Sequence, residues 1–186
     1  MRIPIALNKA TRLLNHGPVT LVSAAAGGKS NVMAAAWVMP LDFDPPKLAV
    51  VLAEGTLTRA LVDQSRELVV QVPPRRMLAA VDGVGSLSGR DVDKWARFHL
   101  LQMPAGRVAA PLIDGCVAWL ECRCLEEESM EKRHDLFVCE VIAAWADDCV
   151  FDADGRMKTP VPEDLRSLHH ISGGTYIVDG EQLRAR

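Results

Sequence analysis

The chain has 186 residues, a length that suits one compact domain spanning residues 1–186. Its formal net charge of −3 at pH 7 provides no overall basic field, which argues against a protein that binds nucleic acid. Hydrophobic residues make up 49% of the chain and charged residues 24%, proportions typical of a globular protein rather than a disordered one.

No apolar segment approaches the ~20 residues that a membrane-spanning helix needs. The N-terminus does not show the long apolar stretch of a secretion signal, so we expect no membrane association and a cytoplasmic location. The five cysteines are an odd number and all lie in the C-terminal half of the chain. This arrangement suits reduced thiols better than a disulfide framework.

Short apolar segments closed by turn residues predict a sheet of short strands. In chain order these segments are 19–26, 34–39, 48–52 and 67–72. Two longer segments, 116–125 and 136–145, flank a charged turn from Glu126 to Asp135 and predict a hairpin. A last short strand is expected near residues 176–178, after an irregular link.

Helical signals are fewer. One helix is predicted over residues 58–65, with the Thr58 hydroxyl as a candidate N-cap, and another over residues 91–98, with Asp91 as its cap. No internal repeat and no boundary to a second domain is visible. The sequence therefore predicts a mainly β fold with a few short helices.

Two glycine-containing segments match nucleotide-binding loops only in part. Gly28-Lys29-Ser30 could end a P-loop, but Ser23 stands where that loop needs its first glycine. In the segment 83–89 the third glycine comes one residue too late for a dinucleotide-binding loop. A plain Gly-Gly turn explains the first segment better, and no clean βαβ unit surrounds the second, so neither nucleotide-binding loop is predicted.

Metal binding and nucleophilic catalysis are also poorly supported. Cys122 and Cys124 share one face of a predicted strand, but no second pair of ligands completes a zinc site. His169-His170 suits a loop better than a ligand pair. We therefore predict no metal site, and the sequence assigns a catalytic role to no residue.

Hydroxyl, amide and cationic residues stand beside the predicted strand and helix ends. They are Ser30, Asn31, Thr56, Thr58, Ser88, Gly89, Arg90 and Lys94. Helix N-termini with hydroxyls and a nearby lysine can hold a phosphate without a glycine-rich motif. Ordinary capping by Thr58 and Asp91, with Arg90 and Lys94 on a solvated surface, explains the same residues, so both interpretations stay open.

Six segments span most of the chain in a fixed order: PVTLVSAAAGGKSNVMAAAW (18–37), DPPKLAVVL (44–52), GSLSGRDVDKW (85–95), LEC (120–122), HDLFVCEV (134–141) and GGTY (173–176). The most specific are Asn-x-Met-x-x-x-Trp, from Asn31 to Trp37, and Ser-Gly-Arg-Asp-x-Asp-Lys, from Ser88 to Lys94. Together the segments resemble the flavin reductase-like family and, within it, the flavoredoxin group.

The resemblance implies an FMN-binding split β-barrel that forms a homodimer, with the flavin near the subunit interface. It further implies an NAD(P)H-dependent flavin reductase, in which a nicotinamide passes a hydride to the flavin. The alternative is a flavoredoxin-type electron-transfer protein that carries FMN, lacks its own nicotinamide site and exchanges electrons with a redox partner protein. The sequence carries no nicotinamide signature, so both stay open, with the reductase preferred.

The resemblance also implies a set of cofactor-binding residues. The segment Asn31 to Trp37 borders the isoalloxazine, with Asn31, Val32, Met33, Ala34 and Trp37 as its cofactor-binding residues. Thr56, Thr58, Ser88, Gly89 and Lys94 contribute to the phosphate and ribityl side, and Ser30 also belongs to the cofactor-binding set. His134 corresponds to a histidine close to the flavin, and Tyr176 to a C-terminal aromatic residue that approaches it. Lys94 or His134 is expected to stabilise the anionic reduced flavin.

Three positions depart from the family pattern. Ala34 replaces a hydroxyl residue, so a backbone hydrogen bond to the flavin is expected there instead of a side-chain one. Ala36 is small and apolar, which leaves Trp37 as the main polar-tipped side chain of its segment. Cys139 stands where glycine is common, and it is expected to narrow the site or to add a thiol near it.

Overall fold

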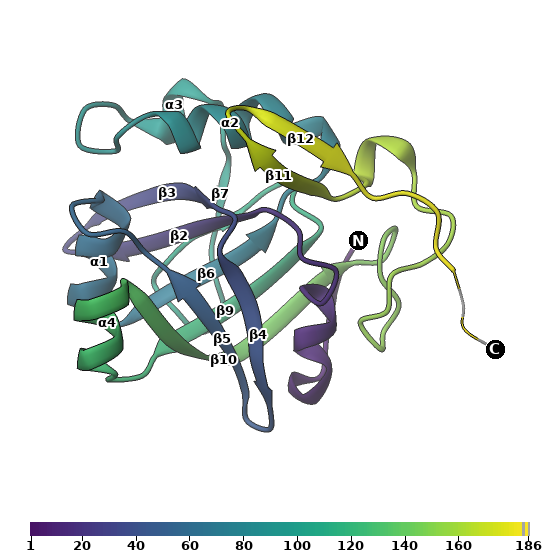
Figure 1. Ribbon diagram of the computed structural model, residues 1–186, viewed down its shortest axis with the longest axis horizontal. Helices are drawn as coiled ribbons and strands as arrows, with labels where there is room; N and C mark the ends of the chain where they lie inside the picture. The colour runs from purple at the N-terminus through teal and green to yellow at the C-terminus, as the bar shows by residue number, and fades with distance from the viewer. Residues whose placement is uncertain (184, 186) are drawn as a thin grey trace.

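An antiparallel sheet of eight strands forms the centre of the computed structural model, which describes residues 1–183 and 185 (Figure 1). Its strands are β1 (Arg2–Pro4), β2 (Thr20–Ala26), β3 (Lys29–Ala35), β4 (Val38–Phe43), β5 (Pro46–Val51), β6 (Glu67–Val72), β9 (Ala118–Cys124) and β10 (Leu136–Asp147). Two small pairs stand apart from it, β7 (Gln102–Met103) with β8 (Leu112–Ile113) and β11 (Leu168–Ser172) with β12 (Thr175–Val178).

The order of the strands shows that the sheet curls. It runs β3-β2-β6-β9-β10-β5-β4, and β1 pairs with β10. β3 and β4 stand at opposite ends of this order, yet only Ala36 and Trp37 separate them in the chain. Because two residues cannot span a flat sheet, the sheet bends until its ends meet at this corner.

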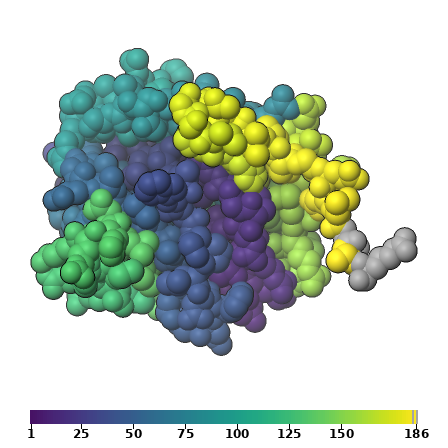
Figure 2. All heavy atoms as spheres, viewed as in Figure 1, coloured from purple at the N-terminus to yellow at the C-terminus, as the bar shows by residue number. Residues whose placement is uncertain are grey.

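The helices cover the ends and one face of the sheet. They are α1 (Leu57–Ser65), α2 (Leu78–Ser86), α3 (Lys94–Arg97) and α4 (Glu128–His134), with short 3-10 helices η1 (Leu7–Leu13), η2 (Arg75–Met77) and η3 (Glu163–Leu165). In Figure 1, α2, α3 and the β11–β12 hairpin lie along one side of the sheet, above β3. Figure 2 shows the hairpin packed beside the α2–α3 region on the surface. None of the described helices is long and apolar enough to cross a membrane.

The apolar core has two parts, one on each face of the sheet. Leu68 and Val70 of β6 point into the interior of the curled sheet with Phe137, whereas Val69 points to the other face, where Val81 of α2 packs. Since side chains alternate along a strand, a strand covered on both faces is apolar without alternation. This explains the continuous apolar character of residues 67–72.

Most of the predicted strands are confirmed, but one predicted strand and one predicted turn are wrong. The strand predicted over 34–39 is wrong, because the chain turns at Ala36 and Trp37 and forms two strands around them. The charged turn predicted between Glu126 and Asp135 is wrong in its structure, because it contains α4. The basic residues of this segment fall in the last turn of α4, where they complement the helix dipole. The predicted hairpin pairing is confirmed, since β9 and β10 are antiparallel neighbours.

Both predicted helix caps are wrong by two residues. Thr56 caps α1, since its Oγ1 accepts a hydrogen bond from the backbone N–H of Arg59 at 3.2 Å, and Thr58 lies inside the helix. Asp93 caps α3, since its Oδ1 accepts from the N–H of Trp95 at 2.9 Å. Residues with side-chain oxygens stand at both alternatives, so the sequence pattern alone did not separate them.

The prediction of reduced thiols is confirmed, since all five cysteines are free. Cys139 does not narrow the predicted site. It is fully buried in the interior core, with its Sγ atom 2.8 Å from that of Cys124 on the neighbouring strand. The expectation of a thiol near the site is therefore wrong, because Cys139 points into the curled sheet.

Candidate functional site

A groove runs between β3, the N-terminus of α1 and the segment that joins α2 to α3. Its central cavity has a volume of about 180 Å³. The predicted site residues that line it are Asn31, Met33, Ala34, Thr56, Thr58, Ser88, Gly89 and Lys94. The fold therefore brings together residues that are up to 63 positions apart, since Asn31 is on β3 and Lys94 begins α3.

Lys94 is buried in the wall of this groove, with only 4% of its surface exposed. Its Nζ donates hydrogen bonds to the backbone carbonyl oxygens of Val32 at 3.1 Å and Val84 at 2.7 Å. Burial lowers its pKa, and among the described residues Lys94 forms no ion pair with an acidic side chain. Lys94 is thus not on a solvated surface, and a buried cation without a counter-ion favours an anionic ligand.

Asn31 and Thr58 form a buried polar pair beside Lys94. Asn31 Nδ2 donates to Thr58 Oγ1 at 2.9 Å, and both side chains are nearly inaccessible to solvent. Gly89 packs directly against this pair: a Cβ at Gly89 would lie 2.2 Å from Asn31 Oδ1. Only a residue without a side chain allows this close approach.

The opposite wall is the N-terminus of α1, where Gly55, Thr56 and Leu57 line the cavity. The first N–H groups of a helix have no partner within it, and the helix dipole favours an anion there. Arg90 fixes the distance between the two walls, because its Nε donates to the carbonyl oxygen of Gly55 at 3.1 Å. Its own N–H donates to Ser88 Oγ at 3.1 Å.

The groove continues over the corner between β3 and β4. Here a hollow of about 310 Å³ is lined by residues 33–37, Val51, Ala53 and His170. Trp37 is 75% exposed, and its carbonyl oxygen accepts a hydrogen bond from the Val51 N–H at 3.1 Å. The small side chains of Ala34 and Ala36 leave the backbone open to a flat ligand.

Two predicted residues of β3 take different places. Val32 points into the core and contributes only its carbonyl oxygen, which accepts from Lys94. Ser30 lies in an adjoining hollow, where its hydroxyl donates to Gln102 Oε1 at 3.3 Å. Trp95 Nε1 donates to the carbonyl oxygen of Ser30 at 3.3 Å, which holds α3 against β3.

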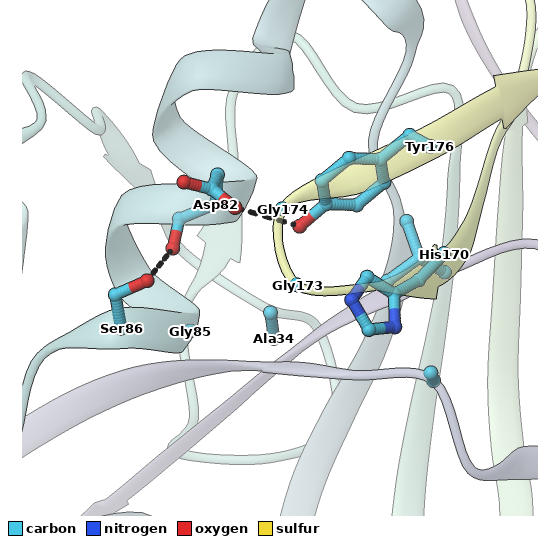
Figure 3. A pocket seen from close by; sticks show the side chains of 10 residues that line it. Ala34, Asp82, Gly85, Ser86, His170, Gly173, Gly174 and Tyr176 are labelled. Atoms are coloured by element: carbon cyan, nitrogen blue, oxygen red, sulfur yellow. Dashed lines mark hydrogen bonds between the residues drawn. The ribbon is translucent and has the colours of Figure 1, made fainter.

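A further hollow, of about 340 Å³, lies between α2 and the β11–β12 hairpin (Figure 3). The hydroxyl of Tyr176 donates to Asp82 Oδ1 at 3.3 Å, and the Tyr176 and His170 rings meet edge to face at 5.1 Å. Burial and the neighbouring Asp82 raise the pKa of Tyr176. Asp82, Ser86 and His170 were not predicted, because their contact with Tyr176 depends on how the hairpin folds back.

His134 lies apart from these hollows. It is the last residue of α4 and is exposed, and none of the cavities described above includes it. Its predicted closeness to a flavin stays a prediction.

The glycines of segment 83–89 belong to a helix and its close packing. A Cβ at Gly83 would lie 2.2 Å from the Phe98 ring, and one at Gly85 would lie 3.4 Å from the Cβ of Ala34. Glycines two apart disfavour a helix in sequence analysis. Here they let α2 approach β3 and α3, which is why this helix was missed.

Comparisons with known proteins identify the family of the chain. A family model described as "Flavin reductase like domain" matches residues 13–161. The chain belongs to the flavin reductase-like family.

Individual relatives extend over almost the whole chain. The protein YddH of Escherichia coli (strain K12) is 37% identical over 186 residues, which cover 98% of this chain and 97% of YddH. The crystal structure of an FMN-binding domain of a flavin reductases-like enzyme from Shewanella baltica OS155 is 43% identical. It has a TM-score of 0.97 and covers 100% of this chain and 98% of that chain.

A flavoredoxin from Methanosarcina acetivorans is 28% identical, with a TM-score of 0.72, and covers 90% of this chain and 87% of that chain. The solved structures similar to this chain thus include both a flavin reductases-like enzyme and a flavoredoxin. The predicted fold, a mainly β FMN-binding split barrel with a few short helices, is confirmed.

Proposed function

We propose that this chain binds FMN in the groove, with the phosphate between Lys94 and the N-terminus of α1. The observation that carries this proposal is the burial of Lys94 without an acidic partner among the described residues. A phosphate there would receive hydrogen bonds from the lysine and from the free N–H groups of α1. The FMN-binding neighbour from Shewanella baltica supports the same cofactor.

The isoalloxazine ring then lies over the corner formed by Ala34, Ala36 and Trp37. A flavin ring is flat and largely apolar with one polar edge, so it suits a hollow lined by small side chains and an aromatic face. With alanine at position 34, hydrogen bonds to the polar edge come from the backbone. Trp37 contributes its broad face or its indole N–H.

The reaction that we propose is that of an NAD(P)H-dependent flavin reductase. When bound, FMN accepts a hydride from a reduced nicotinamide and passes the electrons on. The chain orients the ring through residues 31–37 and anchors its tail through Lys94, and these contacts set the geometry for hydride transfer. We place the reaction in the cytoplasm, where free thiols stay reduced.

A flavoredoxin-type electron carrier is the second candidate. The similarity to the Methanosarcina acetivorans flavoredoxin favours it. Such a carrier would use the same groove for FMN but would receive electrons from a redox partner protein instead of a nicotinamide.

We also propose a homodimer formed through β4. Alternate positions carry large apolar side chains here, Trp37 just before the strand and Met39, Leu41 and Phe43 on it, and each side chain is more than half exposed. β4 is also at an end of the strand order, so an apolar stripe and an unpaired edge coincide. Because Trp37 belongs to both the stripe and the ring hollow, the flavin would lie near the subunit interface.

The first experiment titrates the flavin-free protein with FMN. We expect flavin absorbance to stay with the protein on a desalting column and Trp37 fluorescence to be quenched. The variant Trp37→Phe should lose most of the quenching, whereas Trp119→Phe, in the core, should retain it. A protein that retains no FMN would exclude both candidates.

A second experiment separates the two candidates. The FMN-loaded protein is mixed anaerobically with NADH or NADPH, and the loss of flavin absorbance is followed. Rapid bleaching with turnover on free FMN supports the reductase. Bleaching by dithionite but by neither coenzyme supports the electron carrier.

The dimer is tested by sedimentation. Phe43→Asp places a charge within the proposed interface and should shift the protein from dimer to monomer. Leu183→Asp, at an exposed position outside the stripe, should leave the mass unchanged. If the wild-type protein sediments as a monomer at micromolar concentration, the proposed dimer is wrong.

A further inference from the structure

The hollow between α2 and the β11–β12 hairpin has a chemistry of its own, distinct from that of the phosphate groove. It shares Ala34 and Ala36 with the hollow over which the flavin ring is proposed to lie. Figure 3 shows Asp82 and Ser86 on α2 facing Tyr176 and His170 on the hairpin. A ligand in this hollow would therefore lie beside the ring, and this inference rests on the proposed function.

The hydroxyl groups of this hollow offer lone pairs rather than hydrogens. Tyr176 has one hydroxyl hydrogen and donates it to Asp82 Oδ1 at 3.3 Å. Ser86 likewise donates its hydrogen to the backbone carbonyl oxygen of Asp82 at 2.9 Å. The raised pKa of Tyr176 keeps its hydroxyl protonated at neutral pH, so this arrangement persists. A ligand must consequently supply N–H or O–H donors.

The charged groups that line the hollow also favour a ligand that carries no negative charge. Asp82 is the one acidic residue in its lining, and among the described residues that line it there is neither a lysine nor an arginine. Its volume of about 340 Å³ suits a single ring, and the hollow offers no cation to a pyrophosphate. A carboxylate ligand would meet Asp82 with no positive charge between them, which costs binding free energy.

We propose that this hollow is a selective ligand site beside the flavin: it takes a flat, uncharged ring that carries N–H or O–H donors, and Asp82 rejects anionic rings. The donors bind the Asp82 carboxylate and the Tyr176 oxygen. A ring acceptor, such as a carbonyl oxygen, faces His170. The carboxamide of a nicotinamide coenzyme and a free aromatic amide share this chemistry.

The test compares two probes of equal shape, benzamide and benzoate, on the FMN-loaded protein. Binding is followed through the change in the flavin absorption spectrum at pH 8, above the range in which histidine side chains ordinarily titrate. We expect benzamide to bind at least about tenfold more tightly than benzoate, as one unfavourable charge pair predicts. Equal affinities, or binding of neither probe, would overturn the proposal.

Variants then test whether Asp82 sets the preference. Asp82→Asn keeps the shape of the side chain and removes its charge, so benzoate affinity should rise and the ratio should fall to within about threefold. Asp164→Asn is the matched control, because it removes an exposed carboxylate in η3 outside the hollow, and its ratio should equal that of the wild type. An unchanged ratio in Asp82→Asn contradicts the assigned role.

The two proposals fail in distinguishable ways. FMN affinity is measured first, and its absence contradicts the proposed function before any probe is added. Normal FMN affinity with no preference between the probes contradicts only the selective site. The tetrahydro analogue of the reduced nicotinamide coenzyme, whose ring is uncharged and cannot donate a hydride, is then added as a competitor: displacement of benzamide supports the coenzyme as the source of the ring, and continued binding of benzamide supports a free aromatic amide.

Discussion

The phosphate groove around Lys94 and the neighbouring hollow at Tyr176 form the two ends of the proposed site, and they are built differently. At the Lys94 end the polar groups are buried and are already bonded to protein atoms: Lys94 to two carbonyl oxygens and Asn31 to Thr58. At the Tyr176 end one hydrogen bond of 3.3 Å joins the C-terminal hairpin to α2, and His170 is exposed. We therefore expect the first end, which is organised before a ligand arrives, to supply affinity, and the second, which is held more weakly, to supply selectivity.

The strongest test of this contrast is Lys94→Met. It removes the buried cation while keeping the length of the side chain, so FMN affinity should fall by about 100-fold, as expected for the loss of one buried charge pair. Equilibrium titration with FMN measures the effect. Arg97→Met, on the same helix but exposed and outside the cavity, should bind FMN like the wild type. An equal loss of FMN affinity in both variants would show that the buried charge of Lys94 has no specific role in binding.

The attachment of the hairpin should depend on pH. Burial, and then the neighbouring His169, lower the pKa of His16 to about 4. His16 bonds to Ser167 Oγ at 2.9 Å, at the base of the hairpin. The unfolded chain binds a proton at His16 near pH 6.5 and the folded protein does not, so stability is complete above that pH and is lost as the pH falls toward 4.

The expected loss is on the order of 2 kcal/mol in the free energy of unfolding, measured by urea unfolding at pH 7 and pH 4.5. His16→Gln should flatten this dependence. His99→Asn, at an exposed position, should keep the wild-type slope. If the free energy of unfolding of His16→Gln depends on pH as that of the wild type does, other titrating groups cause the dependence.

A smaller effect is expected from Gly89→Ala. The new Cβ would lie 2.2 Å from Asn31 Oδ1, so Asn31 must move and its hydrogen bond to Thr58 breaks. FMN affinity should fall about tenfold, the equivalent of roughly one hydrogen bond. Gly180→Ala is the control, because nothing lies within 4 Å of its added Cβ. Unchanged affinity in Gly89→Ala would mean that the groove adapts at this end as well.

The smallest expected effect concerns the cap of α1. Thr56→Ala removes the hydroxyl that accepts from the Arg59 N–H and should cost about 1 kcal/mol of stability, measured by thermal unfolding. Thr56→Ser retains the hydroxyl and should unfold like the wild type. If both variants unfold alike, the cap contributes nothing measurable.

The sequence predicted β2, β5, β6, β9 and β10, because apolar segments and turn residues are local signals, but it did not predict β1 and it misplaced the strands around the corner at Trp37. It also predicted the groove through a resemblance that placed Thr58, Gly89 and Lys94 together. The burial of Lys94 was not predictable from its neighbours, because it depends on the packing of α3 against β3 through Trp95 and Ser30. The hydrogen bond between Tyr176 and Asp82 joins residues 94 positions apart, so no local sequence signal predicts it.

The sharp corner at Trp37 links two parts of the backbone that a ligand would otherwise not affect together. The carbonyl oxygen of Trp37 accepts a hydrogen bond from the Val51 N–H, so the corner is connected to β5 as well as to β3 and β4. A ring resting on this corner would oppose the local opening that lets amide hydrogens exchange with solvent. FMN should therefore slow deuterium uptake at Val51 and along β4, although β4 itself does not touch the phosphate end of the groove.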